Sequence, residues 1–191
     1  MFRKRWKPGP NRNGDDGGPR IVKDPVKARG RTMNRAVKLL AAKPRSIEEL
    51  RERLLEKNWT NDEIVSGVIE KLEEYGYLND EKFASDLAIS KLRQKPQGKR
   101  RLQFTLSRKK LSKENVEAAV ESAFEKLPEA RLIEDAIEKL FRLKGVPQTR
   151  EDTRKFYDHL LRRGFGFELI RTKLSEMSKR RAEAAEHDDQ L

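Results

Sequence analysis

The sequence predicts an all-α protein of three tandem three-helix repeats, similar to helix-turn-helix units, that form an elongated, curved solenoid. The first observation behind this prediction is an apolar pattern that occurs three times in the 191 residues. Such repetition is typical of proteins in which each repeat is one structural unit. The copies align at offsets of 52 and then 54 positions: Leu50, Leu54, Trp59, Ile64 and Val68; Leu102, Leu106, Leu111, Val116 and Val120; Phe156, Leu160, Phe165, Ile170 and Leu174.

Helix-capping pairs are the second observation. Ser46 is followed three residues later by Glu49, and Thr149 by Asp152. In such a pair the first side chain accepts a hydrogen bond from a backbone N–H that the helix leaves free. Thr60 and Glu63 repeat the pattern soon after the preceding helix is expected to end. The short interval predicts a tight turn between two helices.

Composition is the third observation. With 35% hydrophobic and 40% charged residues, the chain is too polar for one large central core. A single repeat of about 50 residues would bury too few apolar side chains to offset its conformational entropy. Neighbouring repeats must therefore share surface, as in solenoid proteins, and the molecule is expected to be long.

The chain divides into five expected segments. Residues 1–32 are rich in Gly, Pro and basic residues, which predicts a disordered basic arm, either a solvated tail or a non-specific nucleic-acid tether. The repeats are expected over 33–80, 81–128 and 129–181, and an acidic tail over 182–191.

Glycine and proline mark the expected turns inside the repeats. Pro44 closes the first helix of repeat 1, and Gly145 is expected to end the first helix of repeat 3. Gly164 precedes the last turn, where it permits a positive φ. The equivalent residue of repeat 2 is Lys110, so we expect another backbone route there. The aromatic residues near turns and helix ends are expected to pack in the core rather than to stack on bases: Trp59, Tyr75, Tyr77 and Phe165.

Charge is distributed unevenly along the chain. The net charge is +12, and residues 91–113 hold ten Lys or Arg and no acid, whereas 139–181 hold thirteen bases and five acids. A run without any acid favours polyanion binding over a merely solvated surface. The candidate binding residues are Lys95, Gly98, Lys99, Arg100, Arg101, Arg108, Lys109 and Lys110, with Arg162 and Arg163 as a second group.

Catalytic and metal chemistry are not expected. The chain has no cysteine and two histidines, neither of which has a second metal ligand at a suitable spacing. No nucleophile has a plausible base and no phosphate-binding loop is present, so we expect neither an enzyme nor a cofactor. No long apolar stretch or leader occurs, which predicts a soluble cytoplasmic protein without membrane contact.

The stretch YGYLNDEKFASDLAISKLRQKPQGKRRLQFTLSRKKLS, from Tyr75, resembles the RecX family of recombination regulators. The closing LLRRGFGFELIRTKL is similar to the last repeat of that family, and the likeness covers residues 33–177. Asn79 stands where the family has Asp, and Leu111 with Ser112 replaces a Gly-Ile turn. The matching residues are Gly76, Tyr77, Leu78, Asp80, Phe83, Ala84, Lys95, Gly98, Arg101, Leu102 and Leu106.

The resemblance implies a monomer that lies in the helical groove of a RecA recombinase filament on single-stranded DNA. There it would modulate, and usually inhibit, ATP hydrolysis and strand exchange in DNA repair and recombination. An alternative is a tandem helix-turn-helix protein that binds DNA by itself. Against it, Asp62 and Glu63 of repeat 1 would bring carboxylates to the major groove. A helical scaffolding protein with another partner is a third possibility.

Overall fold

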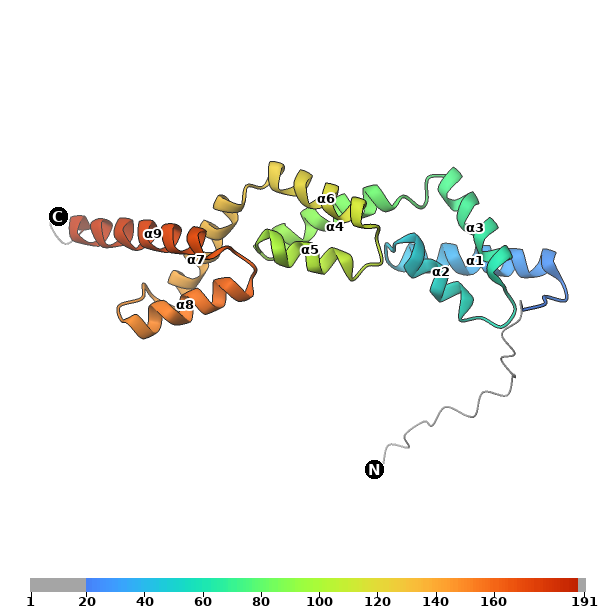
Figure 1. Cartoon of the computed structure of the whole chain (residues 1–191), viewed down its shortest axis with the longest axis horizontal. Helices are drawn as coiled ribbons and strands as arrows, with labels where there is room; N and C mark the ends of the chain where they lie inside the picture. The colour runs from blue at the N-terminus through green and yellow to red at the C-terminus, as the bar shows by residue number, and fades with distance from the viewer. Residues whose placement is uncertain (1–19, 189–191) are drawn as a thin grey trace, which may run out of the picture.

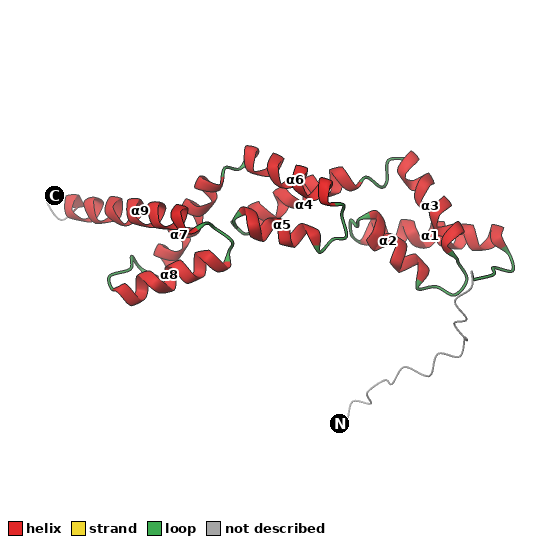
Figure 2. Cartoon of the chain, in the orientation of Figure 1, coloured by secondary structure: helices red, strands yellow, loops and turns green. Residues whose placement is uncertain are grey.

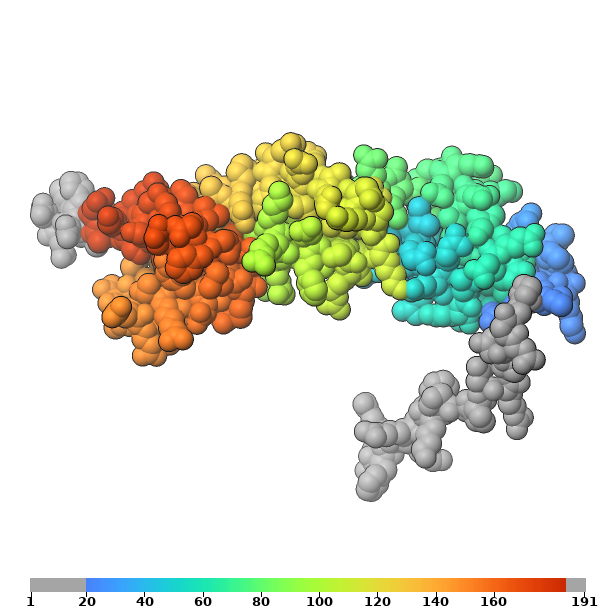
Figure 3. All heavy atoms as spheres, viewed as in Figure 1, coloured from blue at the N-terminus to red at the C-terminus, as the bar shows by residue number. Residues whose placement is uncertain are grey.

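The computed structural model describes residues 20–188, and the part of the chain that it describes consists of helices and connecting turns without a strand (Figure 2). The helices form three groups of three, which follow one another along a gently bowed axis (Figure 1). Figure 3 shows a body much longer than it is thick. The predicted all-α tandem-repeat fold is confirmed.

Repeat 1 begins earlier than the sequence indicated. Its first helix starts at Pro25, because the Asp24 side chain accepts a hydrogen bond from the backbone N–H of Lys27 and proline is favourable in a first helical turn. Residues 25–32, expected in the disordered arm, are therefore helical, and residues 1–19 of that arm lie outside the described part. The helices of repeat 1 are α1 (Pro25–Ala42), α2 (Ile47–Leu55) and α3 (Asp62–Glu74).

The cap of α3 is Asn61 rather than Thr60. The Asn61 side chain accepts a hydrogen bond from the backbone N–H of Ile64 at 3.0 Å. Thr60 instead is buried and shares a 3.0 Å hydrogen bond with the hydroxyl of Thr32, which also donates to the carbonyl of Ala28. The predicted capping position was therefore wrong by one residue, because Thr60 serves to attach the corner between α2 and α3 to α1.

Repeat 2 contains the turn without glycine. Lys110 adopts a φ of 56°, the same left-handed region in which Gly164 lies at 85°. The expectation of another backbone route is therefore wrong, since a lysine takes the conformation that glycine takes in repeat 3. Asn79 caps the first helix of this repeat, as expected for a residue that replaces Asp. The helices are α4 (Asp80–Gln94), α5 (Lys99–Ser107) and α6 (Lys113–Lys126).

Repeat 3 has the longest second and third helices of the described residues. Gly145, with a φ of 77°, ends the first helix, and Thr149 caps the second through a hydrogen bond from the N–H of Asp152. The last helix continues to Asp188, so 182–188 is helical where a frayed tail was expected, and 189–191 lie outside the described residues. The helices are α7 (Glu129–Lys144), α8 (Arg150–Arg162) and α9 (Phe167–Asp188).

The buried apolar side chains form two clusters, not one. One cluster runs without interruption through repeats 2 and 3, whereas repeat 1 has a separate cluster around Leu50, Leu54 and Val68. Shared apolar surface therefore joins repeats 2 and 3, and repeat 1 is joined to repeat 2 by other means. No helix among the described residues is long and apolar enough to span a membrane.

The aromatic residues near turns and helix ends do not all pack in the core. Phe165 is buried and Trp59 is half-buried, but 65% of Tyr75 and 71% of Tyr77 are exposed, so the prediction is wrong for both tyrosines. The cause is Gly76, whose positive φ reverses the chain after α3 and lets Leu78 enter the core while the tyrosines face out.

Candidate nucleic-acid interface

The first turn of α5 concentrates cations where helices usually carry acids. Lys99, Arg100 and Arg101 occupy this turn and are exposed, although the partial positive charge of a helix N-terminus disfavours cations. Gly98 supplies no side-chain cap, and the Glu129 carboxylate accepts the free N–H of Lys99 at 3.1 Å instead. Cations in a first helical turn are unfavourable for the helix, and these three form no ion pair within the described residues that would offset the cost. We infer that they are kept for a function.

The outer face of α5 carries an exposed aromatic ring between two arginines. Arg100, Phe104 and Arg108 follow one another at intervals of four residues, which places them on one side of the helix. Phe104 is 60% exposed, and the guanidinium carbon of Arg108 lies 6.0 Å from the centre of its ring. Leu102 and Leu106, in contrast, are buried on the opposite side. Phe104 was not among the residues predicted from the sequence, although its position out of register with the two leucines was the available signal.

A second group of cations surrounds His159 where repeat 2 meets repeat 3. Burial lowers the pKa of His159, and the positive charges of Arg163, Arg162, Lys144 and Lys95 lower it further. The positive charges of Lys95 of repeat 2 and Arg162 of repeat 3 thus both act on His159. Lys144, at the end of α7, was not among the predicted residues. His159 is half-buried, and its Nε2 has no hydrogen-bond partner.

Arg163 belongs to the contact between repeats more than to the surface. Its side chain is half-buried and donates a hydrogen bond to the carbonyl of Pro96 at 3.3 Å, and burial lowers the pKa of its guanidinium group. Its own carbonyl accepts the backbone N–H of Gly98 at 2.9 Å. Arg163 therefore joins repeat 3 to repeat 2.

Gly98 and Gly164 allow the backbones of these two repeats to touch. A Cβ atom on Gly98 would lie far inside the van der Waals radius of the Gly164 carbonyl oxygen, and one on Gly164 would lie 2.5 Å from the Cβ of Arg101. Gly98 is half of a close contact, so we remove it from the set of predicted binding residues. We call the contact between α5 and the turn from α8 to α9 the glycine junction.

Lys109 and Lys110 are engaged within the chain. The Lys109 ammonium group lies 2.9 Å from the Glu49 carboxylate, and Lys110 forms an ion pair with Glu52. The carbonyl of Lys109 also accepts a 2.6 Å hydrogen bond from the hydroxyl of Ser46. We call this contact between α2 and the turn from α5 to α6 the ionic junction, and we leave both lysines out of the candidate interface.

The two junctions occupy equivalent positions in the repeats. Ser46 and Gly98 are 52 residues apart, and Lys109 and Arg163 are 54 apart, the offsets of the apolar pattern. In each case the capping residue of a second helix donates to a carbonyl in the turn of the next repeat. The equivalent carbonyl of repeat 1, that of Lys57, accepts a 2.8 Å hydrogen bond from the side chain of Arg20, which precedes α1.

The candidate interface is the outer side of α5 together with the adjacent cations of the His159 group. We call it the α5 ridge; α5 lies midway along the molecule, on the same long edge as α2 and α8 (Figure 1). None of its cations forms an ion pair within the described part of the chain. The ridge consists of Lys95, Lys99, Arg100, Arg101, Phe104, Arg108, Lys144 and Arg162.

The remaining family-motif residues lie next to the ridge or in the repeat 1 to 2 connection. Leu78, Ala84, Leu102 and Leu106 are buried core residues. Asp80 accepts a 2.9 Å hydrogen bond from the backbone N–H of Ile47, and burial raises the pKa of its carboxyl group despite that bond. These motif residues thus pack in the core or connect the repeats. Gly76, Tyr77 and Phe83 instead line a groove between repeats 1 and 2.

Fold and surface together define an all-α tandem helical-repeat protein with a cationic middle. Comparison with known families agrees and is more specific. Models described as the first, second and third three-helix domains of RecX match residues 33–72, 79–120 and 129–174. The chain belongs to the RecX family, as its motifs indicated.

Similar proteins support the assignment. The regulatory protein RecX of Prosthecochloris aestuarii is 31% identical over 147 residues, which cover 77% of this chain and 93% of that protein. The one from Thermotoga petrophila is 36% identical over 145 residues, 76% of this chain and 83% of the relative. The crystal structure of RecX from Lactobacillus salivarius matches with a TM-score of 0.69 at 22% identity and covers 79% of this chain and 97% of that one, which shows the shared fold. The family assignment supports a regulatory role.

Proposed function

We propose that this protein binds the RecA recombinase filament on single-stranded DNA in the cytoplasm and inhibits its ATPase and strand-exchange activities. The observation that carries the proposal is the α5 ridge, whose cations lack partners within the described residues and stand midway along an elongated body. Family membership and the regulatory name of the relatives support the choice of partner.

The ridge has the chemistry that single-stranded nucleic acid requires. Cations neutralise backbone phosphates, and exposed aromatic rings stack on unpaired bases of any sequence. Arg100 and Arg108 lie one helical turn before and after Phe104 on the same side of α5, so phosphates on either side of a base stacked on the ring would meet a guanidinium group. A ridge of this kind holds a strand without reading its sequence, as a regulator of a filament on arbitrary DNA must do.

The length of the molecule would let it contact neighbouring subunits of the filament. Because α2, α5 and α8 lie along one edge, a strand on α5 leaves the outer repeats to meet protein subunits on either side (Figure 1). A body bound across neighbouring subunits resists their relative motion. Such a contact inhibits ATP hydrolysis and strand exchange without a catalytic group.

The charges at the helix starts support sequence-specific binding of duplex DNA by this protein alone less well than they support binding to a filament. Asp62 and Glu63 occupy the first turn of α3, and Lys113 at the start of α6 lies 3.8 Å from Glu117. Carboxylates near the starts of these helices repel phosphates and leave few side chains to read base edges.

The proposal is tested by the DNA-dependent ATPase of the cognate recombinase, titrated with this protein. We expect inhibition by the wild-type chain and its loss in a variant with Lys99→Glu, Arg100→Glu and Arg108→Glu. The matched control reverses three exposed cations of α1, Lys27, Arg31 and Lys38, and should inhibit like the wild type. Absence of inhibition by the wild-type chain, together with tight binding to naked duplex, would favour the stand-alone DNA-binding alternative.

A further inference from the structure

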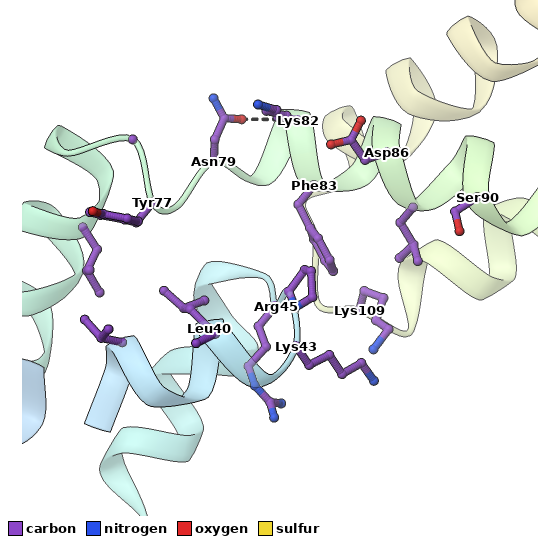
Figure 4. Close-up of a pocket in the computed structure, with 16 residues that line it drawn as sticks. Leu40, Lys43, Arg45, Tyr77, Asn79, Lys82, Phe83, Asp86, Ser90 and Lys109 are labelled. Carbon is purple, nitrogen blue, oxygen red and sulfur yellow. Dashed lines mark hydrogen bonds between the residues drawn. The ribbon is translucent and has the colours of Figure 1, made fainter. Parts of the chain in front are cut away.

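An open groove of about 640 Å³ lies between repeats 1 and 2, and no residue of the α5 ridge lines it. Figure 4 shows that its two sides come from different repeats, with Leu40 and Lys43 of α1 and its end facing Phe83 of α4. Its lining is mostly apolar and includes Val37, Leu40, Ala41, Phe83 and Leu87. A mainly apolar hollow of this volume with a few polar groups is typical of a binding site.

The groove exists because repeats 1 and 2 are joined mainly through α2, by the ionic junction and by the hydrogen bond from the backbone N–H of Ile47 to Asp80. Glu49 and Lys109 hold α2 against the turn of repeat 2, while the apolar clusters of the two repeats stay separate. The facing sides of α1 and α4 are therefore left without a partner. Val37 and Tyr77 remain exposed at its edge, although both could bury apolar surface.

The rim of the groove is cationic. Lys43, Arg45 and Lys82 line it and form no ion pair within the described residues, whereas Asp86 is the one carboxylate among the lining residues. The Nε of Arg45 is buried without a hydrogen-bond partner. A buried donor without a partner is costly and marks a place where an acceptor would be stabilised.

We propose that this groove binds an acidic segment of a partner protein that carries one or two large apolar side chains. The apolar lining takes those side chains, and the cations of the rim pair with flanking carboxylates. The same charges disfavour the chain's own residues 1–19, which contain five Lys or Arg against two Asp. The inference rests on the groove alone and does not require the filament function proposed for the α5 ridge.

The test uses the full-length protein and labelled peptides of about twelve residues, followed by fluorescence anisotropy. The probe alternates Asp and Glu with two Leu and one Phe. One matched peptide carries Lys in place of every acid, and another carries Ser in place of every apolar residue. We expect binding of the acidic amphipathic peptide only. Equal binding of the Lys peptide, or no binding of the acidic one, would overturn the proposal.

Substitutions at the rim test whether the acidic peptide binds in the groove. Tyr77→Ala and Lys82→Glu change exposed residues of the rim, so folding should survive, and each should weaken the acidic peptide about tenfold, the effect of one interaction of roughly 1.4 kcal/mol. The matched controls are Tyr75→Ala and Lys38→Glu, whose residues are exposed but do not line the groove. Unchanged affinity in both rim variants would place the peptide elsewhere.

The α5 ridge variant distinguishes this proposal from the filament function. Its replacements at Lys99, Arg100 and Arg108 leave the groove intact, so the acidic peptide should bind it with wild-type affinity. If the ridge variant lost the peptide as well, the binding would be a general effect of positive charge and the groove would have no role of its own.

Discussion

The glycine junction and the ionic junction use equivalent positions of the repeat but different chemistry. Between repeats 2 and 3 the backbones touch at Gly98 and Gly164, and one apolar cluster runs through both repeats. Between repeats 1 and 2 the contact is polar: the Ser46 hydroxyl, two ion pairs and the hydrogen bond from Ile47 to Asp80 make it, and the apolar clusters remain apart. Equivalent positions of the repeat thus form a close-packed contact between repeats 2 and 3 and a polar contact between repeats 1 and 2.

The two junctions are expected to differ in stiffness. Close-packed apolar surfaces transmit strain, whereas partly exposed ion pairs are weak and are screened by salt. Repeats 2 and 3, which hold the α5 ridge, should behave as one rigid unit. Repeat 1 should move against them, and the groove lies at that more adjustable joint.

The largest expected effect is that of Gly98→Ala. A methyl group at this position meets the backbone of Gly164, which cannot move aside as a side chain can, so we expect the free energy of unfolding to fall by about 1–3 kcal/mol or more. Denaturant unfolding measures it. The matched control is Gly67→Ala in α3, where no atom lies within 4 Å and a gain of about 0.5–1 kcal/mol is expected. Equal stability of Gly98→Ala and the wild type would contradict the close-packed joint.

The next effect concerns the ionic junction. Lys109→Glu places two carboxylates together and should lower the free energy of unfolding by about 1 kcal/mol at low salt, with less effect at high salt. The double variant Glu49→Lys with Lys109→Glu restores opposite charges and should recover most of the loss. If the double variant were as unstable as the sum of the two single variants, the pair would not contribute to the junction.

A smaller effect concerns pH and His159. Because the pKa of His159 is lowered in the folded protein, the unfolded chain binds this proton more readily. The resulting contribution to stability is present above the ordinary value of 6.5 and is lost as pH falls below it. In thermal melts the variant His159→Gln should lose less stability than the wild type between pH 8 and pH 5.5. Parallel pH curves for the two proteins would contradict the described environment.

The smallest expected effect on stability is that of Phe104→Ala. The ring is largely exposed, so unfolding should change by less than about 0.5 kcal/mol. Affinity for single-stranded DNA should nevertheless fall, by the roughly 1–3 kcal/mol that a stacked base contributes. Filter binding or anisotropy with an oligonucleotide measures it. If the Phe104→Ala variant bound single-stranded DNA as tightly as the wild type, Phe104 would not contribute to DNA binding by the ridge.

Local signals predicted most of the helices. The capping side chains of Ser46, Asn79 and Thr149 act on backbone groups three residues away, so a short stretch of sequence contains both partners. Thr60 failed as a predicted cap because its partner, Thr32, lies 28 residues earlier in the chain. The start of α1 was missed because a basic, glycine-containing segment resembles a disordered arm, although Asp24 and Pro25 mark a helix start.

The candidate site was predictable in part. The absence of acids in 91–113 pointed to the segment that carries most of the candidate ridge, since charge density is a property of the segment itself. The engagement of Lys109 with Glu49, 60 residues away, was not visible, and neither was the contact of Gly98 with Gly164. Both depend on how successive repeats dock, and the apolar pattern does not encode that docking.

The role of the α5 ridge in DNA contact is tested by the salt dependence of binding to recombinase filaments on single-stranded DNA. If about five ridge cations meet phosphates, log affinity should fall with log salt at a slope of about −3.5. The variant with Lys99→Glu, Arg100→Glu and Arg108→Glu should bind more weakly and show a slope shallower by about 2. Equal affinity and equal slope for the two proteins would show that the α5 ridge does not meet the DNA of the filament.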